Sequence, residues 1–379
     1  MNILYDYQIF EQQKTGGISR YHTDLYNGLN NYGINCTIGL KYSNNLYLKK
    51  TDINIEEPFK WGDHFISKYR FPGKYKLAQL FSRHFTIKSS LDCNKELTRK
   101  ILRSDKIDIF HPTYYTDIYN DIDIPPMTIT IHDMIYESFP QFSFFIESIS
   151  GKYLLAQKAK KIIAVSEYTK KEILRHYDFI DPQNIEVIHH GIDLNDNKPI
   201  VRQTNKSYLL FVGLRAGYKN FYFFLRAFKK IHKEYKNIQL ICVGPPFNND
   251  EKNYIDFLGL KEFVICKGRV SDNELIELYS NAMAYVSSSL SEGFGIPLLE
   301  GMKYEVPLFI SDIPVYREVA DNAATYFDPT NEDDCFTKFN YIITKQDVIN
   351  QLNNASNRIH LFSKEKMIEN TYNFYKKID

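Results

Sequence analysis

Two glutamates, Glu292 and Glu300, stand eight residues apart in the stretch SSSLSEGFGIPLLE. Gly293 and Gly295 lie between them and allow close backbone approach or an unusual φ. Pro297 stands where a helix would begin, and the free amides of a helix N-terminus suit a phosphate. Two carboxylates would oppose a bare anion, so we interpret them as acceptors for hydroxyl groups, such as those of a ribose and a sugar. The alternative is a helix-capping loop with solvated glutamates.

A second loop of this kind is basic. In the stretch FVGLRAGYKN, Arg215 and Lys219 stand between a predicted strand and a predicted helix. Positive charge is unfavourable at a helix N-terminus. A bound diphosphate would remove the conflict, with Arg as a forked donor and Lys as a point charge. The alternative is a pair of exposed basic residues.

Two further positions follow predicted strands. Gly16 and Gly17 come after the first strand and suit a tight turn that approaches a phosphate, and His132 stands at the carboxyl end of another strand, where ligands of parallel sheets bind. Each signal is weak alone, because most such residues are structural. No CxxC or HExxH spacing occurs, so we expect neither a metal site nor a cofactor.

The elements that must position these residues are short apolar, β-branched runs that alternate with amphipathic stretches. This alternation predicts an α/β fold of parallel sheets covered by helices. A polar stretch at residues 193–206 separates two similar series, and residues 362–378 are predicted to form a final helix. The strands are predicted at residues 2–5, 34–40, 107–111, 127–131, 161–165 and 186–189, and then at 208–212, 238–243, 264–267, 284–287, 307–310 and 325–327.

The length of 379 residues fits most simply two domains at about 150 residues each. The five scattered cysteines argue against a disulfide framework and fit a reducing cytoplasm. No apolar run approaches the roughly 18 residues that span a bilayer, and the N-terminus lacks a basic signal region. We therefore expect a cytoplasmic protein that can associate peripherally with the inner face of the cell membrane.

The net charge of +1 hides an uneven distribution. Eleven lysines and arginines, from Lys60 to Arg103, face three acidic residues, so this segment carries +8 and the rest of the chain −7. Aromatic residues interleave with the basic ones. We predict that part of this segment faces anionic lipid and an acceptor; the alternative is an amphipathic helix pair with its aromatics inward. The acidic remainder argues against nucleic acid as a partner.

In their order and spacing these residues resemble the retaining nucleotide-sugar glycosyltransferases of family 4, which have the GT-B fold. The likeness covers nearly the whole chain and rests on TGGISRY, AVSEYTKKEI, NIEVIHHGID, FVGLRAGYKNF, GRVSDNEL and SEGFGIPLLEGM. It implies two Rossmann-like domains with parallel sheets facing a central cleft. Residues 1–200 with 360–379 would bind the acceptor, and residues 201–359 the nucleotide sugar.

The resemblance assigns roles to the charged residues. Glu300 would bind the ribose hydroxyls, and Glu292 the hydroxyls of the donor sugar. Arg215 and Lys219 would neutralise the departing diphosphate, and His132 would contact the sugar near its 6-position. Relatives often carry Arg directly before this lysine, where this chain has Tyr218, so Arg215 would have to replace it.

The resemblance also assigns backbone contacts. Gly16 and Gly17 would approach the diphosphate from the N-terminal half. The amides of Gly293, Phe294, Gly295 and Ile296 would reach the sugar or phosphate, and the backbone at Arg269 and Val270 would meet the base.

The function implied is metal-independent transfer of a hexose to a glycan or lipid-linked saccharide hydroxyl. GDP-mannose is the expected donor, with a UDP-sugar as the alternative. Two other functions stay open at this stage: a GT-B nucleotide-sugar epimerase, and a non-enzymatic protein that binds a membrane surface or nucleic acid.

Overall fold

The computed structural model describes residues 1–59, 72, 89–104, 106–116, 119, 121–142, 146–195, 208–215, 217–344 and 347–378. All twelve predicted strands are present, and their ends lie within two residues of the predicted ones. They are β1 (Asn2–Tyr5), β2 (Asn35–Ile38), β3 (Ile109–His111), β4 (Thr128–Ile131), β5 (Lys161–Ala164), β6 (Ile185–Val187), β7 (Tyr208–Val212), β8 (Gln239–Val243), β9 (Val264–Gly268), β10 (Ala284–Ser287), β11 (Leu308–Ser311) and β12 (Ala324–Phe327).

Helices alternate with these strands, as the sequence predicts. The first half holds α1 (Gln8–Gln12), α2 (Gly17–Asn30), α5 (Ser90–Leu102), α6 (Ile135–Ser138), α7 (Ile146–Lys158) and α8 (Glu167–His176). The rest of the chain holds α9 (Phe221–Glu234), α10 (Asn249–Phe257), α11 (Asp272–Asn281), α12 (Ile296–Lys303), α13 (Pro314–Ala320), α14 (Glu332–Ile343), α15 (Val348–Arg358) and α16 (Lys364–Tyr375).

The first half contains two three-stranded parallel sheets, in the orders β2-β1-β3 and β4-β5-β6. A single parallel bridge between Phe110 and Met127 links them. Strand β3 of the first sheet therefore lies beside β4 of the second. Strands β3 and β4 are buried along their whole length, because helices cover parallel sheets on both faces.

The second half contains one six-stranded parallel sheet, in the order β12-β11-β10-β7-β8-β9. The order reverses between β7 and β10, as in a Rossmann fold, and this reversal opens a crevice at the carboxyl ends of the strands. Helix α9 packs against the sheet through one apolar stripe, since Phe221, Phe224, Leu225 and Phe228 are all buried.

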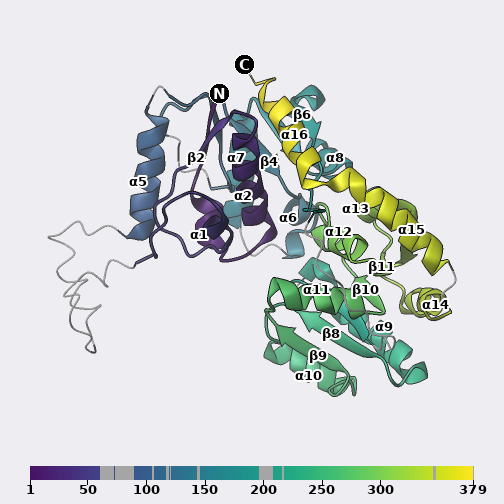
Figure 1. Ribbon diagram of the computed structural model, residues 1–379. Coiled ribbons are helices and arrows are strands. Elements are labelled where there is room, and N and C mark those ends of the chain that lie inside the picture. Colours follow the sequence, from purple (N-terminus) through teal and green to yellow (C-terminus); the bar gives the residue numbers. More distant parts are fainter. Residues whose placement is uncertain are drawn as a thin grey trace.

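The last helix returns to the first half. Figure 1 shows α16, in yellow, beside the start of the chain, and its residues contact α2. The hydroxyl of Tyr375 lies 2.9 Å from that of Tyr5 and 2.6 Å from Nδ1 of His111. The two halves are therefore linked both by the chain near Asp193 and by the crossing from α15 to α16.

Residues 60–71 and 73–88, which make up most of the predicted basic segment, lie outside the described residues, as do residues 196–207 of the predicted linker. Within the described part of the chain, no helix has the length and apolar character needed to cross a membrane.

Candidate active site

A cleft of about 550 Å³ lies between the two halves, at the carboxyl ends of β4, β7 and β10. Ten of the thirteen predicted site residues line it: Gly16, Gly17, His132, Lys219, Glu292, Gly293, Phe294, Gly295, Ile296 and Glu300. The alternation of strands and glycine-bearing loops thus brings together residues from distant parts of the sequence.

The floor of the cleft holds an ion pair between Lys219, which follows β7, and Glu292, which follows β10. The Lys219 ammonium lies 2.5 Å from Oε1 of Glu292. Ser289 and Tyr316 donate to the same oxygen, at 2.6 and 3.3 Å. All these contacts from described residues use Oε1, which leaves the lone pairs of Oε2 to accept from a ligand hydroxyl. The sequence analysis did not single out Ser289, although it stands in the stretch SSSLSEGFGIPLLE, and it did not consider Tyr316.

Two helix N-termini face this floor. Helix α12 begins at Ile296 with Pro297 in its first turn, as predicted, and Gly295 before it has a φ of 97°. Helix α2 begins at Gly17, where an added Cβ would lie 3.3 Å from the Ile296 side chain. Pro297 has no N–H, the Leu298 amide donates to the Gly295 carbonyl, and the Ser19 amide donates to the Gln13 side chain. The first-turn amides left to donate to a ligand are those of Gly17, Ile18 and Ile296, all of which line the cleft.

Gly293 joins the two halves. Its carbonyl accepts from Ser166 Oγ at 2.7 Å and from Thr169 Oγ1 at 3.1 Å, both in the first half. A Cβ at Gly293 would stand only 1.7 Å from the carbonyl oxygen of His132. The sequence predicts a close backbone approach at Gly293, and the structure shows that this approach is a contact between the two halves.

His132 contributes a neutral imidazole to the cleft. Burial, reinforced by His190, lowers the pKa of His132 well below its usual range. The two rings are stacked, with Nδ1 of His132 3.3 Å from Nε2 of His190. Nε2 of His132 is buried and has no hydrogen-bond partner among the described residues. Buried polar atoms are normally paired, so this nitrogen is available to a ligand hydroxyl.

Glu300 lies about one turn into α12. The Tyr279 hydroxyl donates to its Oε2 at 3.0 Å, and Nη1 of Arg20 lies 3.8 Å from its Oε1. Burial raises the pKa of Glu300, while Arg20 and Tyr279 act in the opposite direction. Arg20 comes from α2, so this ion pair also spans the two halves.

The structure does not place Arg215 in the lining of the cleft, so its contact with a diphosphate stays a prediction. Arg215 is only 5% exposed and does not line the cleft. Its Nε donates to Glu251 at 2.8 Å, its Nη2 donates to the carbonyls of Pro245 and Pro246, and its guanidinium packs against Phe247. A carboxylate far away in the sequence binds the guanidinium inside the second half.

Arg269 and Val270 do not line the cleft either. Arg269 is exposed after β9, and Val270 packs against the core that contains Leu298. The predicted backbone contact with a base is therefore not part of the cleft described here.

Comparison with known proteins shows which protein families the two parts of the chain match. Residues 15–196 match the family described as Glycosyltransferase Family 4, and residues 192–359 match the family described as Glycosyl transferases group 1. The structure of S. aureus TarM, solved with UDP, superposes with a TM-score of 0.74 at 14% identity, over 99% of this chain and 100% of TarM. The fold is GT-B, as expected from the sequence.

The curated relatives with similar sequences include mannosyltransferases. The O-antigen chain mannosyltransferase RfbU of Salmonella typhimurium is 32% identical over 246 residues, which are 64% of this chain and 68% of RfbU. A serotype-specific mannosyltransferase WbdA of Escherichia coli is 29% identical over 52% of this chain, but the match spans only 27% of WbdA. The chain belongs to glycosyltransferase family 4, and it is a glycosyltransferase.

Proposed function

We propose that this enzyme transfers mannose from GDP-mannose, with retention, to a saccharide hydroxyl during synthesis of a bacterial surface polysaccharide. The mannosyltransferase names of RfbU and WbdA support the sugar and the pathway. A UDP-hexose is the competing donor, because the TarM structure that shares the fold was solved with UDP.

The observation that carries the proposal is the ion pair of Lys219 and Glu292 between two helix N-termini. Cleavage of the bond between C1 of the sugar and the phosphate oxygen leaves the electron pair on the diphosphate. Fixed donors aimed at that developing charge stabilise the transition state. Lys219 and the first-turn amides would supply them, which is why we expect no metal.

The other residues of the cleft would orient the donor. Oε2 of Glu292 and Nε2 of His132 would bind hydroxyls of the sugar, and Glu300 would accept from the ribose. The acceptor oxygen would attack C1 on the face from which the diphosphate leaves, and its proton would pass to the leaving phosphate oxygen. The closed contact at Gly293 would limit access of water to C1.

The acceptor would approach from the first half. A lipid-linked saccharide is the acceptor we favour, with the basic segment of residues 60–103 against anionic lipid. Sedimentation with vesicles of phosphatidylcholine alone or with phosphatidylglycerol tests this part. Equal binding to both vesicles would contradict it.

The test of the donor uses thermal unfolding with GDP, UDP, GDP-mannose and UDP-glucose, since a ligand that binds only the folded state raises the Tm. Transfer is then followed by mass spectrometry with mannose-containing saccharides. We expect GDP and GDP-mannose to stabilise the protein and the acceptor to gain one hexose. A change in the donor sugar without any acceptor would instead indicate the epimerase.

A further inference from the structure

Arg20 stands where the cleft joins a second pocket. This pocket has a volume of about 250 Å³ and is lined by both halves. It shares Arg20, Tyr47, Leu275 and Glu300 with the cleft. A ligand that extends from the floor of the cleft past Glu300 therefore passes the Arg20 guanidinium.

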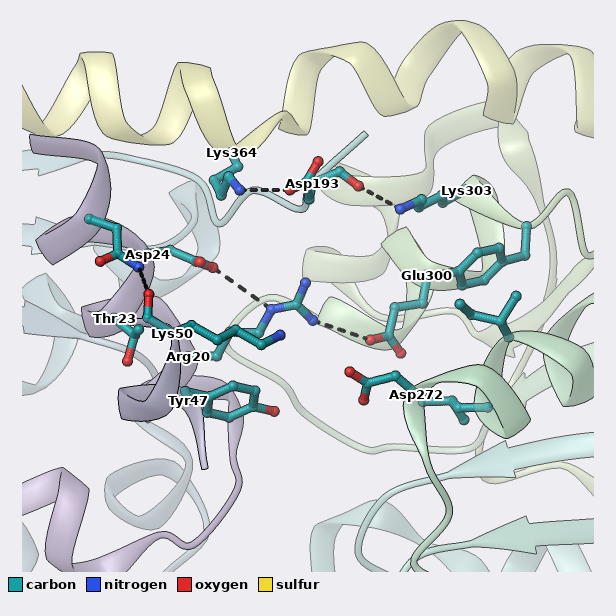
Figure 2. A pocket seen from close by; sticks show the side chains of 14 residues that line it. Arg20, Thr23, Asp24, Tyr47, Lys50, Asp193, Asp272, Glu300, Lys303 and Lys364 are labelled. Atoms are coloured by element: carbon teal, nitrogen blue, oxygen red, sulfur yellow. Dashed lines mark hydrogen bonds and ion pairs between the residues drawn. The ribbon is translucent and has the colours of Figure 1, made fainter. Parts of the chain in front are cut away.

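The guanidinium is held only loosely. Figure 2 shows Arg20 between Asp24 on its own helix and Glu300 on α12. Its Nε is 3.7 Å from Asp24 and its Nη1 is 3.8 Å from Glu300, and both distances exceed those of a hydrogen bond. The side chain is 35% exposed. Arg20 can therefore change partners without breaking a close bond.

Two other cations of the pocket, Lys364 and Lys303, are engaged more tightly. Lys364 lies 2.7 Å from the Asp193 carboxylate, and Lys303 donates to the Asp193 carbonyl at 2.7 Å. Both contacts are visible in Figure 2. Of these three cations of the pocket, Arg20 has the longest contacts, and it alone also lines the cleft.

The position of Arg20 near the N-terminus of α2 favours a bound anion beside it. It lies in the first turn, beside the amides that begin at Gly17. A cation at a helix N-terminus is unfavourable unless an anion offsets it. In this structure Glu300 supplies part of the negative charge from 3.8 Å, and a bound diphosphate would supply more.

We infer that Arg20 is a partner-switching residue for the nucleotide. Without a ligand it pairs with Glu300 across the cleft; with the donor bound, its guanidinium binds the diphosphate and leaves Glu300 to the ribose hydroxyls. This inference rests on the proposed function, because it takes the ligand to be a nucleoside diphosphate sugar.

The test is a calorimetric comparison of guanosine, GMP and GDP, and of the uridine series, on the full chain. Arg20→Gln should weaken binding of the diphosphate at least tenfold. It should leave binding of the nucleoside unchanged or tighten it, because Glu300 is released. Arg20→Lys, which keeps the charge but not the fork, should fall between the two.

Lys50→Gln is the matched control, since Lys50 lines the same pocket from a different element and does not contact Glu300. It should change diphosphate binding less than threefold. Equal loss of nucleoside and diphosphate binding in Arg20→Gln would mean that the Arg20–Glu300 pair only supports the structure. Unchanged diphosphate binding would also overturn the inference. Failure of the wild type to bind either series would instead refute the proposed function.

Discussion

Glu292 illustrates how a single carboxylate can be prepared for one ligand contact. Lys219, Ser289 and Tyr316 converge on Oε1, so the charge is offset and the side chain is fixed in one orientation. A carboxylate fixed in this way need not reorganise when a hydroxyl arrives, and preorganisation is what makes such contacts effective in a transition state.

Replacement of Lys219 should affect chemistry more than binding. We expect Lys219→Gln to lower kcat by about a hundredfold to a thousandfold, the usual cost of removing one group that stabilises developing charge. Steady-state rates of nucleotide release with acceptor present measure this. Lys219→Arg, which keeps the charge, is the control, and a wild-type kcat in Lys219→Gln would contradict the assignment.

Arg215 should behave in the opposite way. Its removal leaves Glu251 buried without its partner, and breaking a buried ion pair costs about 3 kcal/mol or more. We expect Arg215→Ala to lower the free energy of unfolding by that amount in urea titrations. Its kcat/KM well below the melting temperature should stay within a few-fold of wild type. A large loss of activity in a variant of normal stability would restore the role predicted from the sequence.

The difference between these two residues marks a limit of sequence reasoning. Arg215 and Lys219 stand on one loop and are both positively charged. Their roles differ because Glu251 on α10 lies where it binds Arg215. No local pattern shows which carboxylate a cation will meet. The pairing of His132 with His190 is hidden for the same reason.

Elements were far more predictable than contacts. Alternating apolar runs and glycine loops marked every strand, because the periodicity of a buried parallel strand is a local property. The start of α12 followed from Pro297, whose missing N–H suits the first turn. The contact of Gly293 with His132 could not be predicted, because it depends on how the halves pack.

Gly295 allows an element-scale test with a matched control. Its φ of 97° is unfavourable for other residues, and an added Cβ would stand 3.0 Å from the Tyr316 ring. Gly259 has a φ of 73° with nothing within 4 Å of its Cβ position. Both Gly295→Ala and Gly259→Ala should lose about 1 kcal/mol of stability.

Only Gly295→Ala should also lose activity, by tenfold or more, because a shifted Tyr316 no longer donates to Glu292. Urea unfolding and transfer rates on both variants decide the matter. Equal activity in the two would show that the Gly295 site tolerates the methyl group.

At the scale of the whole molecule, the halves are held together by buried and partly buried polar contacts. Glu318 of α13 accepts from the amides of Glu167 and Tyr168 at the start of α8, and from His189. Although burial acts to raise it, these hydrogen bonds lower the pKa of Glu318. Its stabilising contribution is therefore present above the unfolded pKa and is lost in acid.

Buried histidines should make the fold acid-sensitive. Burial lowers the pKa of both His111 and His190 to about 3, whereas an unfolded histidine titrates near about 6.5. Between these values the unfolded chain binds more protons, so stability falls as the pH falls. Each group contributes a slope of up to about 1.4 kcal/mol per pH unit.

His111→Gln isolates this effect, because His111 does not line the cleft. The variant will be less stable at neutral pH, since His111 bonds to Tyr375 and Thr130. Its stability should nevertheless depend less steeply on pH, by about 1 kcal/mol per unit near pH 5. Urea titrations at several pH values give both slopes, and identical slopes would rule out His111 as the source.

The hydrogen bonds from Ser166 and Thr169 to the Gly293 carbonyl restrict how the two halves can move relative to each other. Any rotation of the halves that preserves these two bonds has its axis near the floor of the cleft. Displacement grows with distance from the axis, so a small angle changes little beside Gly293 and more at contacts that lie farther from it. Such a motion would open the outer parts of the cleft while the backbone contact at Gly293 keeps its geometry.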